Sequence, residues 1–174
     1  RLGQVLLNLV NNAVKFTQSG EIVVRVELDN AVKDQVTLKF TVTDTGIGMA
    51  AEQMKKIFQA FVQADTSTTR QYGGTGLGLT ICTHLVTRMG GKISVSSEKG
   101  KGSTFTFTAL FAGQKTEQKP APPVNLRGMR VLVVDDNSTF RTNLRQTLTD
   151  FSFDVATVES GRDALEILEK FTDK

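Results

Sequence analysis

One stretch of the sequence places a carboxylate and two glycines at the end of an apolar pattern. Residues 44–49 read Asp-Thr-Gly-Ile-Gly-Met, and apolar side chains alternate with polar ones over residues 35–43. This alternation predicts a half-buried strand whose core-facing side has the parity of Asp44. A carboxylate removed from water needs hydrogen bonds, and Gly46 and Gly48 permit close backbone approach. The pattern indicates either a site for a flat ligand with an exposed donor or a plain Asp-Thr-Gly turn.

A second group of polar residues forms a stripe on a helix predicted over residues 2–16. Gln4, Asn8, Asn12 and Lys15 are spaced by four, four and three residues, which places them on one helix face. Asn is a poor helix former because its amide competes for backbone groups. The stripe therefore either binds a ligand or is the solvent face of an amphipathic helix. The apolar face is predicted to contain Leu2, Val5, Leu6, Leu9, Val10, Ala13 and Val14.

The third candidate is the glycine-rich segment 73–79, which follows a long polar run over residues 62–72. A loop of that length inside a compact domain is uncommon unless it binds or covers a ligand. Glycines that open a helix leave N–H groups exposed, and the helix dipole adds partial positive charge, so this segment suits a phosphate. The helix that follows is predicted to end at Gly90. This helix carries Leu77, Ile81, Leu85 and Met89 at spacings of four.

The elements that would position these groups are strands and short helices. Apolar residues in the helix predicted over residues 50–62 have core spacing and are interpreted as packing: Met54, Ile57, Phe58 and Phe61. The strands are predicted over residues 21–29, 35–43, 93–96 and 103–111, with a turn at 30–34 that makes the first two a hairpin.

The composition restricts the class of protein. With 39% hydrophobic and 22% charged residues among 174, the chain is typical of a soluble globular protein. The net charge is only +3 and no dense Lys/Arg run is present, which argues against a nucleic-acid partner. No apolar run approaches about 18 residues and no signal peptide is seen, so we expect a cytoplasmic fragment without membrane contact. The single cysteine, Cys82, fits a reducing compartment.

Several kinds of site are excluded by the motifs. His84 is the only histidine, which argues against Ser-His-Asp or Cys-His chemistry and favours a structural role for this residue. The Cys and His residues show no metal-site spacing.

The chain begins with Arg1 and enters a helical pattern directly, so it looks like part of a longer protein.

The character of the chain changes after residue 113. Residues 114–128 contain all three prolines and are predicted to be a stiff, solvated linker. Residues 129–174 then show a strand–helix–strand–helix pattern, in which the apolar run 131–134 is typical of a strand covered on both faces. Asp135 and Asp136 follow that strand directly.

Four separated segments of residues 1–113 resemble the motifs of sensor histidine kinases. Residues 8–17 are similar to the N box and residues 44–49 to the G1 box. Residues 57–61 are similar to the F box and residues 73–79 to the G2 box. Order and spacing match, which makes the four together a strong signal although each alone is weak.

The resemblance implies a Bergerat ATP-binding fold, a two-layer α/β sandwich with helices on one face of a mixed sheet, and it implies ATP and Mg²⁺ as cofactors. Asp44 would accept the adenine amino group, directly or with a water beside it, and Asn12 would hold Mg²⁺. The remaining site residues expected from the resemblance are Asn8 and Lys15 at the phosphates, Gly46 and Gly48 beside the base, Arg70, Gly74, Gly76 and Gly78 as lid and anchor, and Phe58, Thr75, Leu77 and Thr104. Such a site orients and neutralises a triphosphate and contains no nucleophile of its own.

Residues 129–174 resemble the first half of a response-regulator receiver domain, of the flavodoxin-like class. Asp135 and Asp136 match its Mg²⁺ pocket, but the chain lacks the third strand that carries the phosphoacceptor aspartate. Because a missing third strand leaves the strand 131–134 with an open edge, we predict that this half is poorly ordered, domain-swapped or paired with another chain. The resemblance implies a hybrid histidine kinase.

The implied partners are a histidine-bearing dimerisation domain of the homodimeric parent and a receiver in cis or a separate response regulator. The first strand and helix of the ATP domain also look absent, and no autophosphorylation within the fragment is expected. The parent is expected to be cytoplasmic or anchored in the inner membrane.

Two other functions fit parts of the same pattern. A gyrase-, MutL- or chaperone-type ATPase would require a general-base Glu near Asn8 or Asn12, where the sequence has Leu, Val and Asn. A non-catalytic signalling module would keep the fold as a docking surface only. Mg²⁺-dependent nucleotide binding distinguishes that module from both ATP-binding alternatives.

Overall fold

The computed structural model describes residues 1–59, 76–113 and 126–172, with side chains to residue 169. The chain divides into two compact units, unit 1 over Arg1–Gln114 and unit 2 over Lys115–Lys174. Arg70, Gly74 and Thr75, and the linker prolines, lie outside the described residues.

Unit 1 contains a four-stranded sheet built from two hairpins. Its strands are β1 (Ile22–Val32), β2 (Gln35–Asp44), β3 (Ile93–Glu98) and β4 (Gly102–Ala112), in the order β1-β2-β4-β3. All three strand pairs are antiparallel, which corrects the expected mixed sheet in the described part of the unit. The reason is local, because the short connections β1–β2 and β3–β4 can only make hairpins.

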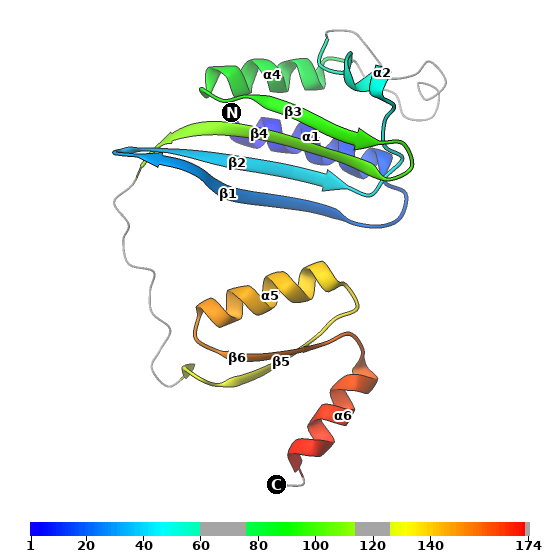
Figure 1. Cartoon of the computed structure of the whole chain (residues 1–174), viewed down its shortest axis with the longest axis vertical. Helices are drawn as coiled ribbons and strands as arrows, with labels where there is room; N and C mark the ends of the chain where they lie inside the picture. Colours follow the sequence, from blue (N-terminus) through cyan, green and yellow to red (C-terminus); the bar gives the residue numbers. More distant parts are fainter. Residues whose placement is uncertain (60–75, 114–125, 173–174) are drawn as a thin grey trace. The chain divides into compact units, whose positions relative to one another are not determined.

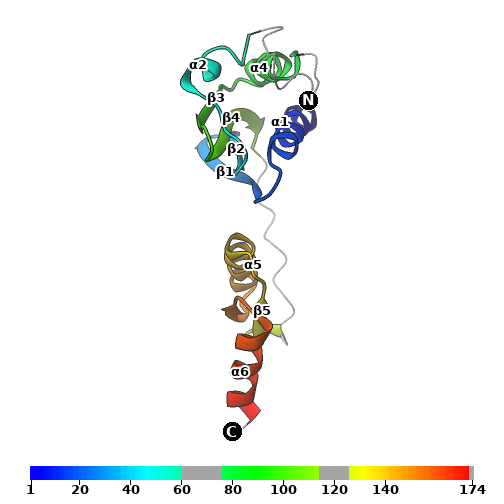
Figure 2. The same cartoon turned by 90° about the vertical axis from the view of Figure 1, so that its right-hand side faces the viewer.

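The helices of unit 1 are α1 (Leu2–Phe16), α2 (Ala51–Met54) and α4 (Gly78–Arg88). Figures 1 and 2 show α1 and α4 on the same face of the sheet, so the expected two-layer sandwich is confirmed. The core between the layers draws its buried side chains from α1, α4, the two central strands and the segment that follows α2: Val5, Leu9, Ala13, Phe40, Val42, Ile57, Cys82, Leu85, Val86, Phe105, Phe107 and Ala109.

The β1 strand is the uncovered part of this sheet. It extends three residues further than expected and turns at Lys33, whose φ is 52°. Val24, Val26 and Leu28 pair with core-facing residues of β2 but are 47%, 52% and 63% exposed. Their alternation correctly predicted a strand, whereas burial depends on a covering layer, and no β1 side chain belongs to the buried core.

Two helix predictions need correction. Val14, predicted on the apolar face of α1, is exposed, because the buried side of that helix is formed by Val5, Leu9 and Ala13. In α4, Ile81 is exposed as well, because the buried side is formed by Cys82, Leu85 and Val86. Of the helix expected over residues 50–62, the structure describes residues up to 59, and within these the helix is regular over Ala51–Met54. After that the backbone continues as turns, as in the bond from Gln59 N to Lys56 O (2.9 Å).

Unit 2 shows the predicted strand–helix–strand–helix order. Its elements are β5 (Arg130–Val134), α5 (Ser138–Asp150), β6 (Asp154–Val158) and α6 (Gly161–Thr172), and β5 and β6 pair in parallel. Val133 and Ala164 are its buried apolar residues among the described side chains.

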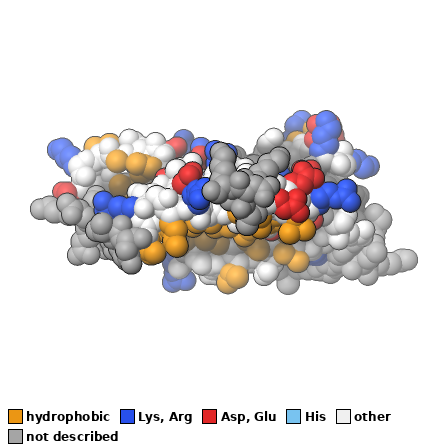
Figure 3. Space-filling model, turned by 90° about the horizontal axis from the view of Figure 1, so that it is seen from below, with side chains coloured by type: hydrophobic (Ala, Val, Ile, Leu, Met, Phe, Trp, Pro, Cys, Tyr) orange, Lys and Arg blue, Asp and Glu red, His pale blue; other side chains and the backbone are white. Residues whose placement is uncertain are grey.

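Many apolar side chains of unit 2 remain exposed, and Figure 3 shows hydrophobic side chains at the surface between charged ones. The exposed ones include Met129, Val134, Phe140, Phe151, Leu165 and Leu168. Pairing of this half with another chain stays a prediction.

Candidate functional site

Three of the four stripe residues of α1 lie away from its solvent face. Asn8, Asn12 and Lys15 are partly buried, whereas Gln4, at the start of the stripe, is exposed. Leu7 and Val14 are 63% and 60% exposed. Asn8, Asn12 and Lys15 therefore face other parts of unit 1, which favours the ligand interpretation for these three residues over the solvent-face alternative.

Asn8 connects the stripe to the start of α4. Its Nδ2 donates to Gly78 O (3.5 Å) and to Cys82 Sγ (3.6 Å). These contacts use the amide nitrogen and leave the amide oxygen as an acceptor. The structure thus brings the helix stripe and the end of the glycine-rich segment together, seventy residues apart in sequence.

Gly76, Leu77 and Gly78 form the described end of that segment. Gly76 has φ 68°, a backbone conformation that favours glycine. Leu77 O accepts the first helical bond of α4, from Ile81 N (2.9 Å). The N–H groups before that bond belong to the first turn of α4, where a helix has no internal acceptors to offer them.

Asp44 is a buried carboxylate at the end of β2, with 6% exposure. Its Oδ1 accepts Gly46 N (2.9 Å) and Ser103 N (3.3 Å). In the described part of the chain both bonds go to Oδ1. Two N–H donors provide hydrogen bonds to this carboxylate in a site from which water is largely removed, and Oδ2 is the oxygen that a ligand donor could use.

The loop after Asp44 is held from both sides by main-chain atoms. Ile47 N donates to Phe16 O at the end of α1 (3.1 Å), and Gly100 N donates to Ile47 O from the β3–β4 turn (2.8 Å). A third contact goes to a side chain of β3, because Met49 N donates to Ser97 Oγ (2.8 Å).

Gly46 and Gly48 have structural reasons for lacking a side chain. A Cβ on Gly46 would collide with the carbonyl oxygen of Phe16, and one on Gly48 with that of Glu98. Gly48 also has φ 62°. Close approach is the property expected of these glycines, and here the approaching atoms are those of the chain itself.

Ser103 takes the place that the sequence assigned to Thr104. Asp44 pairs with Ser103, which is 8% exposed, whereas Thr104 pairs with Thr43 and bonds to its Oγ1 (3.2 Å) on the opposite face of the sheet. Thr104 thus lies on the face opposite to Asp44, and its role at a ligand stays a prediction. Strand parity could have found Ser103, because it shares the face of Phe105 and Phe107.

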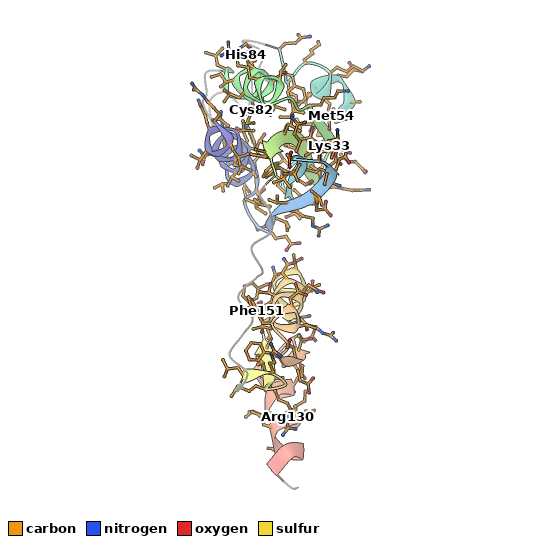
Figure 4. All side chains as sticks on the ribbon, turned by 90° about the vertical axis from the view of Figure 1, so that its left-hand side faces the viewer. Lys33, Met54, Cys82, His84, Arg130 and Phe151 are labelled. Carbon is orange, nitrogen blue, oxygen red and sulfur yellow. The ribbon has the colours of Figure 1, made fainter. Side chains whose placement is uncertain are left out.

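Phe58 and Cys82 pack against the core, whereas His84 is exposed; Figure 4 labels Cys82 and His84 on α4. Phe58 packs partly buried against the core, and its carbonyl accepts Thr80 Oγ1 (3.4 Å). Cys82 is fully buried, and this burial raises the pKa of its thiol. His84 is exposed on the same helix.

The aspartates of unit 2 lie in a more open setting. Asp135 Oδ1 accepts Asn137 N (2.8 Å), its carbonyl accepts Arg141, and Asp136 is exposed. Within the described residues, no group of three Asp, Glu, His or Cys side chains is arranged to hold a metal ion. The Mg²⁺ pocket expected at Asp135 and Asp136 stays a prediction.

Residues 1–113 match the family described as histidine kinase-, DNA gyrase B-, and HSP90-like ATPases. The chain belongs to this family. The match covers all of unit 1 except its last residue and includes every element that carries the site.

Sequence similarity to sensor kinases extends over most of the chain. A sensor histidine kinase, GacS, of Pseudomonas protegens is 42% identical over 155 residues, which is 89% of this chain and 17% of that protein. The autoinducer 2 sensor kinase/phosphatase LuxQ of Vibrio vulnificus is 41% identical over 98% of this chain and 21% of its own length. The chain thus spans about a fifth of the length of these relatives.

Among solved structures, full-length ShkA in complex with AMPPNP is similar with a TM-score of 0.72 and 33% identity. The similarity covers 95% of this chain and 32% of that one. A mycobacterial sensor histidine kinase, MprB, shares the fold at 24% identity and a TM-score of 0.54. None of the helices in the described part of the chain is both long enough and apolar enough to span a bilayer.

Proposed function

We propose that unit 1 binds ATP with Mg²⁺ and presents its γ-phosphoryl group to a histidine on a separate dimerisation domain, as the catalytic domain of a hybrid histidine kinase. The observation that supports this most directly is the buried Asp44 carboxylate, held by Gly46 N and Ser103 N at the end of β2. Membership of the ATPase family and the similarity to ShkA, a protein solved in complex with AMPPNP, support the same class of ligand.

The base would be recognised at Asp44. A buried carboxylate oxygen accepts a hydrogen bond from an amino group and repels an oxo group, so this position favours adenine over guanine or hypoxanthine. Ser103 lies beside it in the sheet and adds a second polar group. The anchored loop 45–49 keeps this end of the site in shape before a ligand arrives.

The phosphates and the cation would be held between α1 and α4. Mg²⁺ prefers oxygen ligands, and the amide of Asn12 supplies one, so this residue fits the ion, whereas Asn8 would face the phosphates. Lys15, in the last turn of α1, adds a positive charge, and the first N–H groups of α4 suit the phosphate oxygens. Mg²⁺ would supply charge neutralisation of the triphosphate when bound.

Clamp-type ATP hydrolysis, the second candidate, is disfavoured by α1 itself. That helix reads LGQVLLNLVNNAVKF and contains no Asp or Glu that could act as a general base toward water. Transfer to another protein requires only that the chain orient the triphosphate. The proposal also includes a histidine-bearing dimerisation domain as the partner. It further assigns residues 129–174 to the first half of a receiver domain.

Titration of the 174-residue chain with ADP, with and without Mg²⁺, tests the nucleotide site. We expect Asp44→Asn to weaken ADP binding by about 1.5–3 kcal/mol, because the hydrogen bond to the amino group loses its charged acceptor. Asp29→Asn, an exposed aspartate in the same sheet, is the matched control and should bind as the unmodified chain does. An unchanged dissociation constant for Asp44→Asn would refute the adenine assignment.

Two further measurements separate the alternatives. Asn12→Ala should remove the Mg²⁺ dependence more than the binding itself, with the exposed Asn11→Ala as control. Radiolabelled ATP should label an added histidine-bearing dimerisation domain. Release of phosphate without any added domain would instead favour the hydrolytic candidate.

A further inference from the structure

Ser97, on β3, lies at the centre of a hydrogen-bond network that the proposed site does not yet use. Its Oγ accepts Met49 N (2.8 Å), donates to Gly102 O (2.8 Å) and lies 3.0 Å from Ser103 Oγ. The hydroxyl therefore joins the loop that follows Asp44 to both strands of the β3–β4 hairpin. Its neighbour Ser96 is exposed, and the β-strand alternation places it on the other face.

The hydrogen inventory of this network decides what Ser103 can do. A serine hydroxyl carries one hydrogen, and a carbonyl oxygen only accepts. The bond from Ser97 to Gly102 O therefore uses the single hydrogen of Ser97. It follows that the bond between the two serines uses the hydrogen of Ser103, so Ser103 presents only lone pairs to its surroundings.

Ser103 is thereby an acceptor beside another acceptor. Its backbone N–H is committed to Asp44 Oδ1 (3.3 Å), and the two residues are register partners with side chains on the same face. Two acceptors side by side favour an amino group or a water that donates to both. They penalise an oxo group, which would face two oxygens and no hydrogen.

We propose that Ser97 is a positioning residue that fixes Ser103 as a hydrogen-bond acceptor and so strengthens the preference of the site for a 6-aminopurine over a 6-oxopurine. This inference rests on the proposed binding of an adenine nucleotide at Asp44. Ser97 acts through Ser103 and is not required to touch the ligand.

Removing the Ser97 hydroxyl has two separable consequences. Met49 N and Gly102 O lose a partner, which loosens the loop and weakens every nucleotide alike. In addition, the Ser103 hydroxyl is released and can rotate to donate its hydrogen to an oxo group. The ratio of dissociation constants for IDP and ADP cancels the first effect and reports the second.

The experiment measures ADP and IDP binding to the 174-residue chain by calorimetry, in the presence of Mg²⁺. We expect Ser97→Ala to reduce the IDP/ADP ratio by about fivefold, the size of one neutral hydrogen bond. Ser97→Thr keeps a hydroxyl and should keep the ratio, and Ser96→Ala should change neither constant. Ser97→Cys has nearly the shape of serine with a weak donor, so it should behave as the alanine variant does.

The outcomes distinguish this inference from the function on which it depends. If the unmodified chain binds neither nucleotide, the proposed function fails. If it binds ADP but the ratio is the same in Ser97→Ala, including equal losses for both ligands, Ser97 is only structural and the inference is wrong. Should the alanine variant fail to fold, the Thr and Cys variants give the same comparison, and equal ratios for these two would overturn it.

Discussion

Asp44 and Asp135 each lie at the end of an apolar strand, yet the two units make different use of them. Asp44 is 6% exposed and bonded to two backbone N–H groups, one of them from a neighbouring strand. Asp135 is half-buried, and its carboxylate accepts a bond from Asn137, two residues away. A carboxylate becomes a defined part of a site when long-range packing surrounds it, and unit 1 has the layers that provide this.

The contrast extends to how each unit is stabilised. Unit 1 buries aromatic and aliphatic side chains between a sheet and two helices, whereas unit 2 has exposed phenylalanine and leucine side chains on its helices. Unit 1 should therefore respond most to changes in its core, and unit 2 to changes in its local hydrogen bonds.

The largest expected effect is that of Phe107→Ala in the core of unit 1. Phe107 is fully buried and stacks on Phe40 with ring centroids 4.7 Å apart. Its truncation should lower the free energy of unfolding of unit 1 by about 3–5 kcal/mol, because it leaves a cavity. Phe140→Ala in unit 2, at 52% exposure, should change stability by no more than about 0.5 kcal/mol. Hydrogen exchange followed by mass spectrometry reports each unit separately, and equal effects would remove the contrast.

The second largest expected difference between the two units comes from substituting one glycine in each of them. Gly46→Ala should destabilise unit 1 by about 1–3 kcal/mol, since the new methyl group meets the carbonyl oxygen of Phe16 and the backbone must move. Gly161→Ala at the start of α6 meets nothing within 4 Å and should be neutral or slightly stabilising. Thermal unfolding monitored by exchange in each unit measures both. A stable Gly46→Ala variant that still binds ADP would mean that the loop is not fixed at α1.

The smallest predicted effect concerns unit 2 and its cap. Asn137 Oδ1 accepts Phe140 N (2.8 Å) at the start of α5. Asn137→Ala should cost about 1 kcal/mol of unit 2 stability, whereas Asn137→Asp, which retains the acceptor, should cost little. Because α5 has few buried contacts to compensate, the loss should appear across the whole helix in exchange rates. A loss limited to the first turn would show that packing, and not the cap, holds α5.

The sequence predicts those parts of unit 1 that depend on periodicity and fails where the neighbouring layer decides. The parity of residues 35–43 correctly placed Asp44 on the buried face. The same alternation in β1 said nothing about Val24 and Leu28 being exposed, because a strand pattern does not reveal whether a helix covers it. Val14 was misplaced because the spacing of apolar residues on a helix does not show how much of its apolar face another layer covers.

The site residues show a similar division. Helical spacing correctly grouped Asn8 with the other stripe residues, and the structure places it against Gly78. Thr104 was expected from the resemblance, whereas the register pairs Asp44 with Ser103. Strand parity with Phe105 and Phe107 could have pointed to Ser103, but only the structure shows that it is the partner of Asp44. Ser97 carries no motif and becomes visible only through its three hydrogen-bonded neighbours.

The loop after Asp44 is fixed through the amides of Gly46, Ile47, Met49 and Gly100 and the carbonyl groups of Phe16 and Ile47. The Ile47 side chain takes part in none of these bonds and is 50% exposed. The shape of the loop is therefore independent of what that side chain is, as long as the backbone is undisturbed. Residue 47 is thus a position where a labelled or crosslinking amino acid can be introduced next to the proposed base-binding end without changing the geometry around it.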